Sequence, residues 1–164
     1  MDYVQTTEQR ITEEWITNKY SIYKTMLFRI AYSYLGNKHD CEDILQEAFI
    51  KLCYSSPEFQ SEVDEKKWII RITINLCKNH LKSFWNRKRI NSDELDAYFY
   101  EPDEKEVLIN ILQLSTKYKT VILLYYIEGY KISEISSILN LSESAIKMRL
   151  KRGRELLKIE LEES

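Results

Sequence analysis

The sequence predicts an all-α protein made of two small helical domains that a flexible linker joins. Glycine and proline are scarce, at 3 and 2 of 164 residues, whereas sheets and turns usually need more of both. Apolar residues recur at helical spacing through most of the chain. The acidic stretch 90–103 interrupts that pattern and contains Pro102. We therefore place the linker there, between domains at residues 11–89 and 104–161.

Overall charge and cysteine content narrow the class of protein. The formal net charge of -2 argues against a generally basic nucleic-acid binder, although charge of one sign gathers in patches. The 3 cysteines are widely spaced, and we expect buried thiols in a reducing cytoplasm rather than a disulfide or a zinc site. No apolar run approaches the ~20 residues of a membrane span, and no signal peptide opens the chain. We expect a cytoplasmic protein.

Residues 11–35 predict a long core helix that Gly36 ends, with a break near Ser21 as an alternative. Ile22 and Tyr23 are among its expected core residues. The periodicity of this stretch accounts for its residues as packing, and nothing in it indicates chemistry.

The stretch 40–54 predicts an amphipathic helix with an unusual outer face. Asp40 is suited to cap it, and its acidic start suits a helix N-terminus. Ile50 projects opposite the face that should be buried. An apolar residue ringed by acidic and polar groups is a candidate protein-binding site, although single exposed apolar residues are also normal. The neighbours of Ile50 on this face are Asp43, Gln46, Glu47 and Tyr54.

Residues 55–67 predict a loop that ends near a helix cap at Ser61 or Asp64. Phe59 is the isolated aromatic residue in this loop. It could pack beneath the domain or line a pocket, and packing is the simpler expectation.

The stretch 68–89 predicts a helix that is apolar around most of its circumference, with one polar and cationic stripe. Such a stripe suits a phosphate backbone, and asparagine side chains can contact base edges. Trp68 and Trp85 could stack on unpaired bases, with core packing as the alternative. A solvated charged face is the alternative for the stripe. Its members are Arg71, Asn75, Lys78, Asn79 and Lys82.

Residues 131–157 predict a short helix, a tight turn at 140–142 and a longer basic helix that Ser142 caps. From Lys147 to Arg154 every charge is positive, and Gly153 falls on the apolar arc of the second helix. This pattern is typical of a helix-turn-helix, whose second helix enters the DNA major groove. A solvated helix face is the alternative, which the turn, the buried glycine and the one-signed charge disfavour. The candidate DNA contacts are Ser142, Ser144, Lys147, Met148, Arg149, Lys151, Arg152 and Arg154.

With these stretches in this order, the chain resembles the extracytoplasmic-function (ECF) group of alternative sigma factors, in the sigma-70 family of bacterial RNA polymerase. The motif D-x-E-D-I-x-Q-E-x-F-I at 40–50 resembles the polymerase-binding helix of the family. The motif W-x-x-R-I-x-x-N-x-x-K-N-x-L at 68–81 resembles the helix that melts and reads the minus-ten promoter element. Residues 142–154 resemble the helix-turn-helix that binds the minus-thirty-five element.

The resemblance implies roles for particular residues. Those expected to bind core polymerase are Asp40, Asp43, Gln46, Glu47, Ile50 and Tyr54. Those expected at the minus-ten element are Phe59, Trp68, Arg71, Asn75, Lys78, Asn79 and Lys82. The candidate contacts of 142–154 are expected at the minus-thirty-five element. The loop 55–67 resembles the family's pocket for a flipped-out base, but not closely enough to transfer individual base contacts.

The resemblance also implies partners. They are promoter DNA, a coiled coil of the largest polymerase subunit, the flap region of the second-largest subunit, and a cognate anti-sigma factor that can be membrane-anchored. We expect no cofactor, no metal and no small-molecule substrate. The sequence carries no phosphate-binding glycine loop, metal-spaced cluster or activated nucleophile, so we expect no enzyme. A stand-alone helix-turn-helix repressor or activator is the second hypothesis, but it leaves 40–54 and the stripe on 68–89 without a role. A nucleic-acid-processing enzyme is the third.

Overall fold

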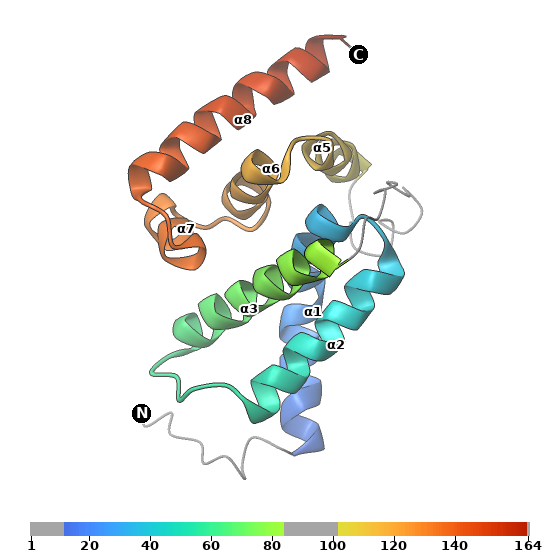
Figure 1. The fold of residues 1–164 in the computed structure, drawn as a ribbon, viewed down its shortest axis with the longest axis vertical. Helices are drawn as coiled ribbons and strands as arrows, with labels where there is room; N and C mark the ends of the chain where they lie inside the picture. The colour runs from blue at the N-terminus through green and yellow to red at the C-terminus, as the bar shows by residue number, and fades with distance from the viewer. Residues whose placement is uncertain (1–11, 84–101, 164) are drawn as a thin grey trace. The chain divides into compact units, whose positions relative to one another are not determined.

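The computed structural model describes residues 12–83 and 102–163, and every regular element in those ranges is helical (Figure 1). This confirms the predicted all-α class. The chain divides into two compact units, residues 1–87 and 88–164. Residues 90–101 of the predicted linker lie outside the described residues, and the helix after it begins at Pro102 rather than Glu104. No helix in the described ranges has the continuous apolar length that a membrane span requires.

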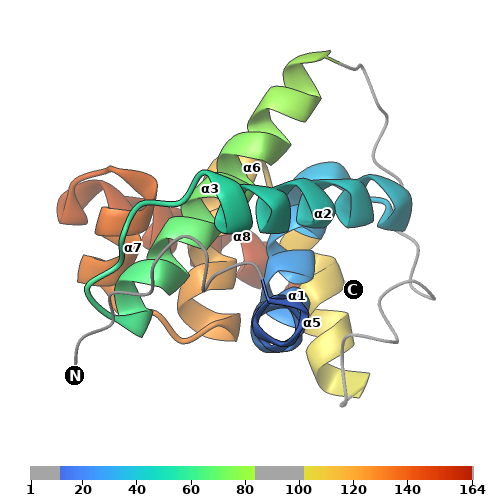
Figure 2. The same ribbon diagram turned by 90° about the horizontal axis from the view of Figure 1, so that it is seen from below.

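The N-terminal unit is built from three helices, α1 (Glu13–Leu35), α2 (Lys38–Tyr54) and α3 (Glu62–Ser83). Each of the three packs against the other two. Figure 2 views α1 nearly along its axis, with α2 and α3 crossing beside it. Apolar side chains from all three helices fill the space between them. The largest completely buried ones are Leu27, Phe28, Ile30, Tyr32, Tyr34, Leu52, Ile69 and Ile70.

Local hydrogen bonds fix where these helices begin and end. As predicted, Gly36 ends α1, with a φ of 71° and its N–H donating to the carbonyl of Tyr32. The helix continues through Ser21 without a break. The predicted cap of α2 was wrong by three residues, because Asn37 Oδ1, not Asp40, accepts from a first-turn N–H. Ser61 Oγ accepts from the backbone N–H of Asp64 at 3.2 Å, which confirms Ser61 among the two predicted caps. Helix α3 begins directly after it at Glu62, before the stretch 68–89 in which the sequence predicted a helix.

One expected core residue of α1 lies at the surface. Ile22 is 58% exposed, whereas its neighbour Tyr23 is buried. Consecutive positions of an α-helix point about 100° apart, so the two side chains face different surroundings. Tyr23 faces α3, where its hydroxyl reaches Glu65.

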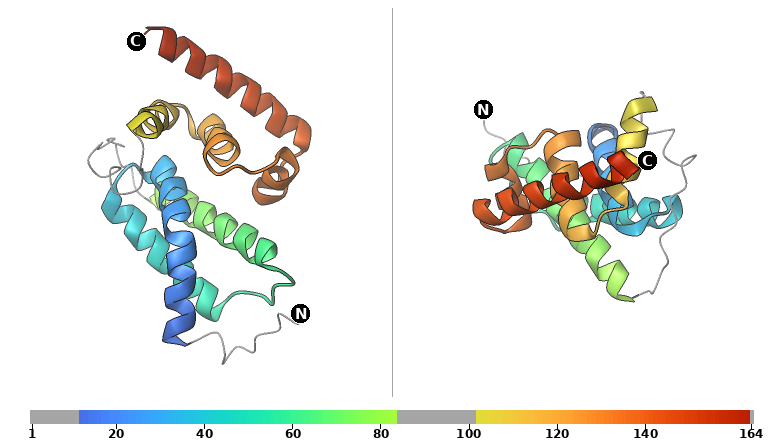
Figure 3. Two further views of the ribbon diagram at one scale, coloured as in Figure 1. Left: turned by 180° about the vertical axis from the view of Figure 1, so that it is seen from behind. Right: turned by 90° about the horizontal axis from the view of Figure 1, so that it is seen from above.

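The C-terminal unit contains α5 (Pro102–Leu112), α6 (Thr116–Ile122), a π-helical segment η3 (Leu123–Ile127), α7 (Ile132–Leu139) and α8 (Glu143–Glu163). The long α8 packs against α5, α6 and α7, as Figure 3 shows. The apolar spacing of residues 116–128 predicts one continuous α-helix, but α6 ends at Ile122 and the π segment follows it. The apolar core of this unit includes Leu108, Ile111, Val121, Ile122, Ile135, Ile138, Ile146 and Leu150.

Gly153 allows α8 to approach α6 closely, and it is buried as predicted. A Cβ atom at this position would lie 2.8 Å from Cγ1 and 3.0 Å from Cδ1 of Ile122. Ile122 is itself almost completely buried. A larger residue at 153 would therefore push the two helices apart or force Ile122 into another conformation.

Candidate nucleic-acid and protein interfaces

The outer face of α2 is exposed and acidic around an apolar centre. Ile50 is 52% exposed and Tyr54 is 66% exposed, and the two lie one helical turn apart. The side chains of Asp43, Gln46 and Glu47 are exposed on the same helix. The opposite face, which includes Ile44, Leu45, Ala48 and Leu52, is buried. The amphipathic pattern is therefore as predicted, and we name these five exposed residues the α2 face.

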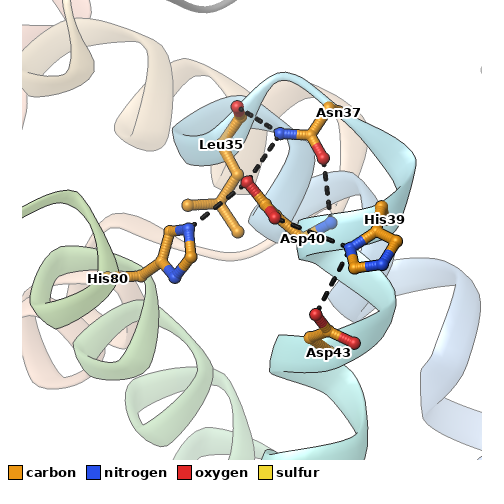
Figure 4. A network of polar contacts seen from close by, with 6 residues as sticks. All are labelled: Leu35, Asn37, His39, Asp40, Asp43 and His80. Carbon is orange, nitrogen blue, oxygen red and sulfur yellow. Dashed lines mark hydrogen bonds and ion pairs between the residues drawn. The ribbon is translucent and has the colours of Figure 1, made fainter. Parts of the chain in front are cut away.

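Asp40 differs from the α2 face because its carboxylate points back into the N-terminal unit (Figure 4). Its Oδ2 accepts from Asn37 Nδ2 at 2.8 Å and lies 3.3 Å from Nε2 of His80 on α3. Partial burial raises the pKa of the Asp40 carboxyl, but the Asn37 hydrogen bond and the charge of His80 outweigh it. The net result is a lowered pKa for the Asp40 carboxyl. The same contacts link the start of α2 to the later turns of α3.

His39 stands beside this link on the solvent side. Its Nδ1 lies 3.3 Å from Asp43 Oδ2 and 3.8 Å from Asp40 Oδ1. Among the described residues these three are the group whose ligand atoms, all within 4.8 Å of one another, could hold a metal ion. His39 and Asp43 are exposed, and exposed acidic groups of this kind are common without a metal. We assign them no metal.

The polar stripe of α3 lies on the solvent side of that helix. Its side chains are all exposed, namely Arg71, Asn75, Lys78, Asn79 and Lys82. The buried side of the same helix contributes Ile69, Ile70, Thr73, Ile74 and Cys77 to the core. The cations and amides are thus gathered on one exposed strip, as the helical spacing predicted. We name this strip the α3 stripe.

Two aromatic residues next to the α3 stripe contact each other. The rings of Phe59 and Trp68 have centroids 5.6 Å apart and planes inclined at 63°, an edge-to-face arrangement. Both side chains are partly exposed. Phe59 therefore packs on Trp68 of α3 and stays partly exposed, and its role in lining a pocket stays a prediction. Trp85 lies outside the described residues.

A buried ion pair holds the first turn of α3, and sequence reasoning missed it. Lys19 Nζ of α1 lies 2.6 Å from Glu65 Oε1, and the hydroxyl of Tyr23 donates to the same oxygen at 2.7 Å. The Lys19 and Glu65 side chains are only 6% and 3% exposed. Buried charges are rarely tolerated without a partner. The sequence signal that could have indicated this pair is Lys19 and Tyr23, which lie one helical turn apart on an otherwise apolar face of α1.

The turn between α7 and α8 has the geometry of a helix-turn-helix. Asn140 ends α7 in the left-handed region, with φ 54° and ψ 49°, a conformation that asparagine tolerates better than most residues. Ser142 Oγ then accepts from the backbone N–H of Ala145 at 3.1 Å, as its predicted capping role requires. At the other end of α7, Glu134 accepts from the backbone N–H of Lys131 at 3.1 Å.

The outer face of α8 is basic and exposed. Met148, 72% exposed, stands among the exposed side chains of Lys147, Lys151 and Arg152. Arg149 is partly buried, and Arg152 also pairs with Glu155 at 3.3 Å. Arg154 Nη1 donates to the hydroxyl of Tyr126 at 2.9 Å, a contact that the sequence did not suggest. We name the exposed side chains Ser144, Lys147, Met148, Lys151, Arg152 and Arg154 the α8 face.

Comparisons with known proteins agree with this layout. The family model of sigma-70 region 2 matches residues 20–87, and that of sigma-70 region 4 matches residues 111–157. The ECF RNA polymerase sigma factor SigW of Bacillus subtilis is 31% identical, over 85% of both chains. SigX of the same organism is 27% identical, over 92% of this chain and 85% of SigX.

Two solved structures share the fold. CnrH, solved in complex with the cytosolic domain of CnrY, superposes with a TM-score of 0.72 at 21% identity and covers 96% of both chains. RpoE of Bartonella quintana, solved with the anti-sigma factor NepR, gives a TM-score of 0.72 at 18% identity over 89% of this chain and 96% of RpoE.

The three-helix unit and the helix-turn-helix unit therefore match sigma-70 regions 2 and 4 in the same chain order. The identity and coverage of the match to SigW show common descent. The chain belongs to the sigma-70 family, among its ECF RNA polymerase sigma factors.

Proposed function

We propose that this ECF sigma factor binds its three partners through three separate surfaces, each on its own helix. The α2 face binds core RNA polymerase, the α3 stripe captures the minus-ten element, and the α8 face binds the minus-thirty-five element. One observation carries the proposal. Each surface is exposed on its own helix, and its charge has the sign that its partner requires. Membership of this family makes the chain a transcription initiation factor and not an enzyme.

The α2 face suits a basic protein surface, and we propose the coiled coil of the largest polymerase subunit. Ile50 and Tyr54 supply an exposed apolar centre, and Asp43 and Glu47 supply negative charge around it. Apolar centres with a charged rim are typical of protein interfaces. Asp40 supports this face from behind through Asn37 and His80. We propose that the C-terminal unit contacts the flap region of the second-largest subunit.

The α8 face suits the major groove of duplex DNA. In this proposal base edges are contacted by Lys147, Met148, Lys151 and Arg152, which are exposed on α8. Phosphates are contacted by Arg149, Arg154 and the capped start of α8 near Ser142. Ser144 lies in the first turn of the same helix. In this arrangement base contacts determine sequence preference and phosphate contacts hold the helix in register.

The α3 stripe and the aromatic pair suit a separated strand. Arg71, Lys78 and Lys82 offer cations to the backbone, and Asn75 and Asn79 offer amides to base edges. Phe59 and Trp68 offer partly exposed rings beside them, and an unpaired base can stack on the face of such a ring. Capturing a flipped base offsets the few kcal/mol that unstacking costs. Two DNA sites in one chain reinforce each other, because the second binding event is intramolecular.

The remaining parts of the proposal concern location and control. We propose that the chain acts in the cytoplasm and that a cognate anti-sigma factor, either soluble or membrane-anchored, covers its surfaces until a signal arrives. RpoE of Bartonella quintana was solved with the anti-sigma factor NepR bound, and CnrH was solved with the cytosolic domain of CnrY bound. The proposal includes no cofactor and no small-molecule substrate.

Run-off transcription with core polymerase tests the proposal. The purified chain should direct initiation from mapped start sites on fragments of its own genome. Asp43→Arg combined with Ile50→Asp should abolish core binding in a pull-down and leave the fold intact by circular dichroism. Ile22→Asp is the matched control, because Ile22 is about as exposed as Ile50 and lies on α1. A chain that binds duplex DNA but never core polymerase would instead be a stand-alone repressor or activator.

A further inference from the structure

The segment just before the helix-turn-helix has an uncommon backbone. Residues Leu123–Ile127 form a π-helical turn, in which the N–H of Glu128 donates to the carbonyl of Leu123 at 3.0 Å. π-Helical turns make up well under about 1% of protein residues and occur frequently at functional sites. The wider turn changes the direction of the side chains that follow. Leu123 and Leu124 are buried, while Tyr126 emerges 49% exposed.

Tyr126 is held at the surface by two contacts. Its ring meets that of Tyr125 edge to face, with centroids 4.9 Å apart. Its hydroxyl oxygen accepts from Arg154 Nη1 at 2.9 Å. A phenol that accepts through its oxygen still carries its own hydrogen, which must point to a different acceptor. A guanidinium has five N–H donors, so one bond to Tyr126 still allows a forked contact with an anion.

The side of α8 that carries Arg154 is positively charged. Lys147, Lys151 and Lys158 lie three, four or seven positions from Arg154, so they share its side of α8. All three side chains are exposed. Glu155 pairs with Arg152 instead. Two donors, Tyr126 O–H and Arg154 N–H, therefore stand together beside a row of cations, an arrangement suited to a phosphate diester.

We propose that Tyr126 and Arg154 jointly bind one backbone phosphate of the upstream promoter duplex. The Tyr126 hydroxyl donates to one phosphate oxygen and the Arg154 guanidinium to another. This inference rests on the proposed binding of duplex DNA by the α8 face and adds to it a contact from outside the helix-turn-helix. Because the pair ties η3 to α8, the phosphate fixes the angle at which α8 enters the groove.

Holoenzyme binding to a labelled duplex that carries only the upstream element tests this, measured by fluorescence anisotropy over a potassium chloride series. Tyr126→Phe should weaken binding about fivefold at fixed salt, because it removes one hydrogen bond to a charged group and keeps the ring. Arg154→Gln should weaken binding more and reduce the slope of log K against log salt by about 0.9, the value for one phosphate. The double variant should lose less than the product of the single losses, since both donors act on one phosphate.

Tyr125→Phe is the matched control, because it removes a hydroxyl from the neighbouring residue and should leave binding unchanged. Equal melting temperatures for the variants show that the fold is intact. If the wild-type holoenzyme binds and Tyr126→Phe binds equally well, the inference is overturned and the proposed function stands. If the wild-type holoenzyme fails to bind any upstream duplex, the proposed function of α8 is overturned, and the inference with it.

Discussion

Helices α3 and α8 each present cations to solvent, but the protein holds them in place by different means. The first turn of α3 is held by charge, because the buried carboxylate of Glu65 pairs with Lys19 and accepts a hydrogen bond from the Tyr23 hydroxyl. α8 is held by close apolar packing, with Ile146 and Leu150 buried and Gly153 against Ile122.

The difference predicts different sensitivities. A buried ion pair is stable only while both partners are present, because a single charge left in a low-dielectric interior is costly. An apolar contact at van der Waals distance is sensitive to volume and indifferent to charge. We therefore expect changes of charge to disturb the first turn of α3, and changes of size to disturb the contact between α8 and α6.

The largest expected effect comes from breaking the buried pair. Glu65→Leu should lower the free energy of unfolding of the N-terminal unit by about 3–5 kcal/mol, because Lys19 then lies buried without its carboxylate. The triple change Lys19→Met, Tyr23→Phe and Glu65→Leu should recover most of that loss. Urea denaturation followed by circular dichroism measures both. A loss below about 1 kcal/mol for Glu65→Leu would show that charge does not hold α3.

The next effect separates the two DNA surfaces by function. Lys151→Ala with Arg152→Ala should weaken binding to the upstream duplex by about 2–3 kcal/mol, as expected for lost base contacts. Asn75→Ala should leave duplex binding unchanged and slow strand opening. Gel shifts measure the first property, and permanganate footprinting of the promoter measures the second. If Asn75→Ala weakened duplex binding as much as Lys151→Ala with Arg152→Ala, the assignment of duplex binding to the α8 face and strand capture to the α3 stripe would be wrong.

A smaller effect should depend on pH. The pKa of Asp40 is lowered in the folded chain from its ordinary value of 3.8, so its contribution to stability is complete above that value. The contribution is lost as the pH falls through the folded pKa. Asp40→Asn should therefore destabilise the N-terminal unit by about 1 kcal/mol at neutral pH, and the difference from wild type should vanish in strong acid. Urea midpoints over a pH series measure this.

Asp43→Asn serves as the control for that measurement. Its carboxylate is exposed, and an exposed contact such as the one with His39 contributes little to stability. We expect no change in the urea midpoint for this variant and weaker binding to core polymerase. The reverse outcome, with Asp43 important for stability and Asp40 for polymerase binding, would exchange the two assignments.

The smallest expected effect tests the packing of α8. Gly153→Ala gains about 1 kcal/mol of helix propensity but loses about 1–3 kcal/mol to overpacking against Ile122. The net result should be a loss of about 1 kcal/mol. Ile122→Val removes the Cδ1 atom, so adding Gly153→Ala to that background should cost less. Thermal melting of the four chains measures the coupling, and additive losses would contradict a direct contact.

Much of the fold and of the candidate surfaces could be predicted from the sequence, because helical spacing decides which side chains share a face. The exposure of Ile50 and of the α3 stripe follows from spacing alone. Contacts between distant residues could not be predicted in this way. Lys19 and Glu65 are 46 positions apart and resemble ordinary solvated charges in the sequence. The π-helical turn at Leu123–Ile127 has no sequence pattern that separates it from an apolar helix.

Asp40 illustrates an intermediate case. Its place at the start of α2 could be predicted, but its direction could not, because that depends on Asn37 and on His80 of another helix. Position along a helix is thus set by local sequence, whereas the direction of a polar side chain is set by its partners on other helices.

The buried cysteines of the N-terminal unit can report how often its three helices separate. Cys41 and Cys77 are buried, and burial raises the pKa of the partly exposed Cys53 thiol. Since the thiolate is the reactive form, alkylating reagents should modify the folded chain slowly. Each transient opening of the three-helix unit would uncover the two inner sulfurs and leave a permanent mass tag. Pulsed alkylation followed by mass spectrometry would therefore measure how often this unit opens, with and without polymerase bound.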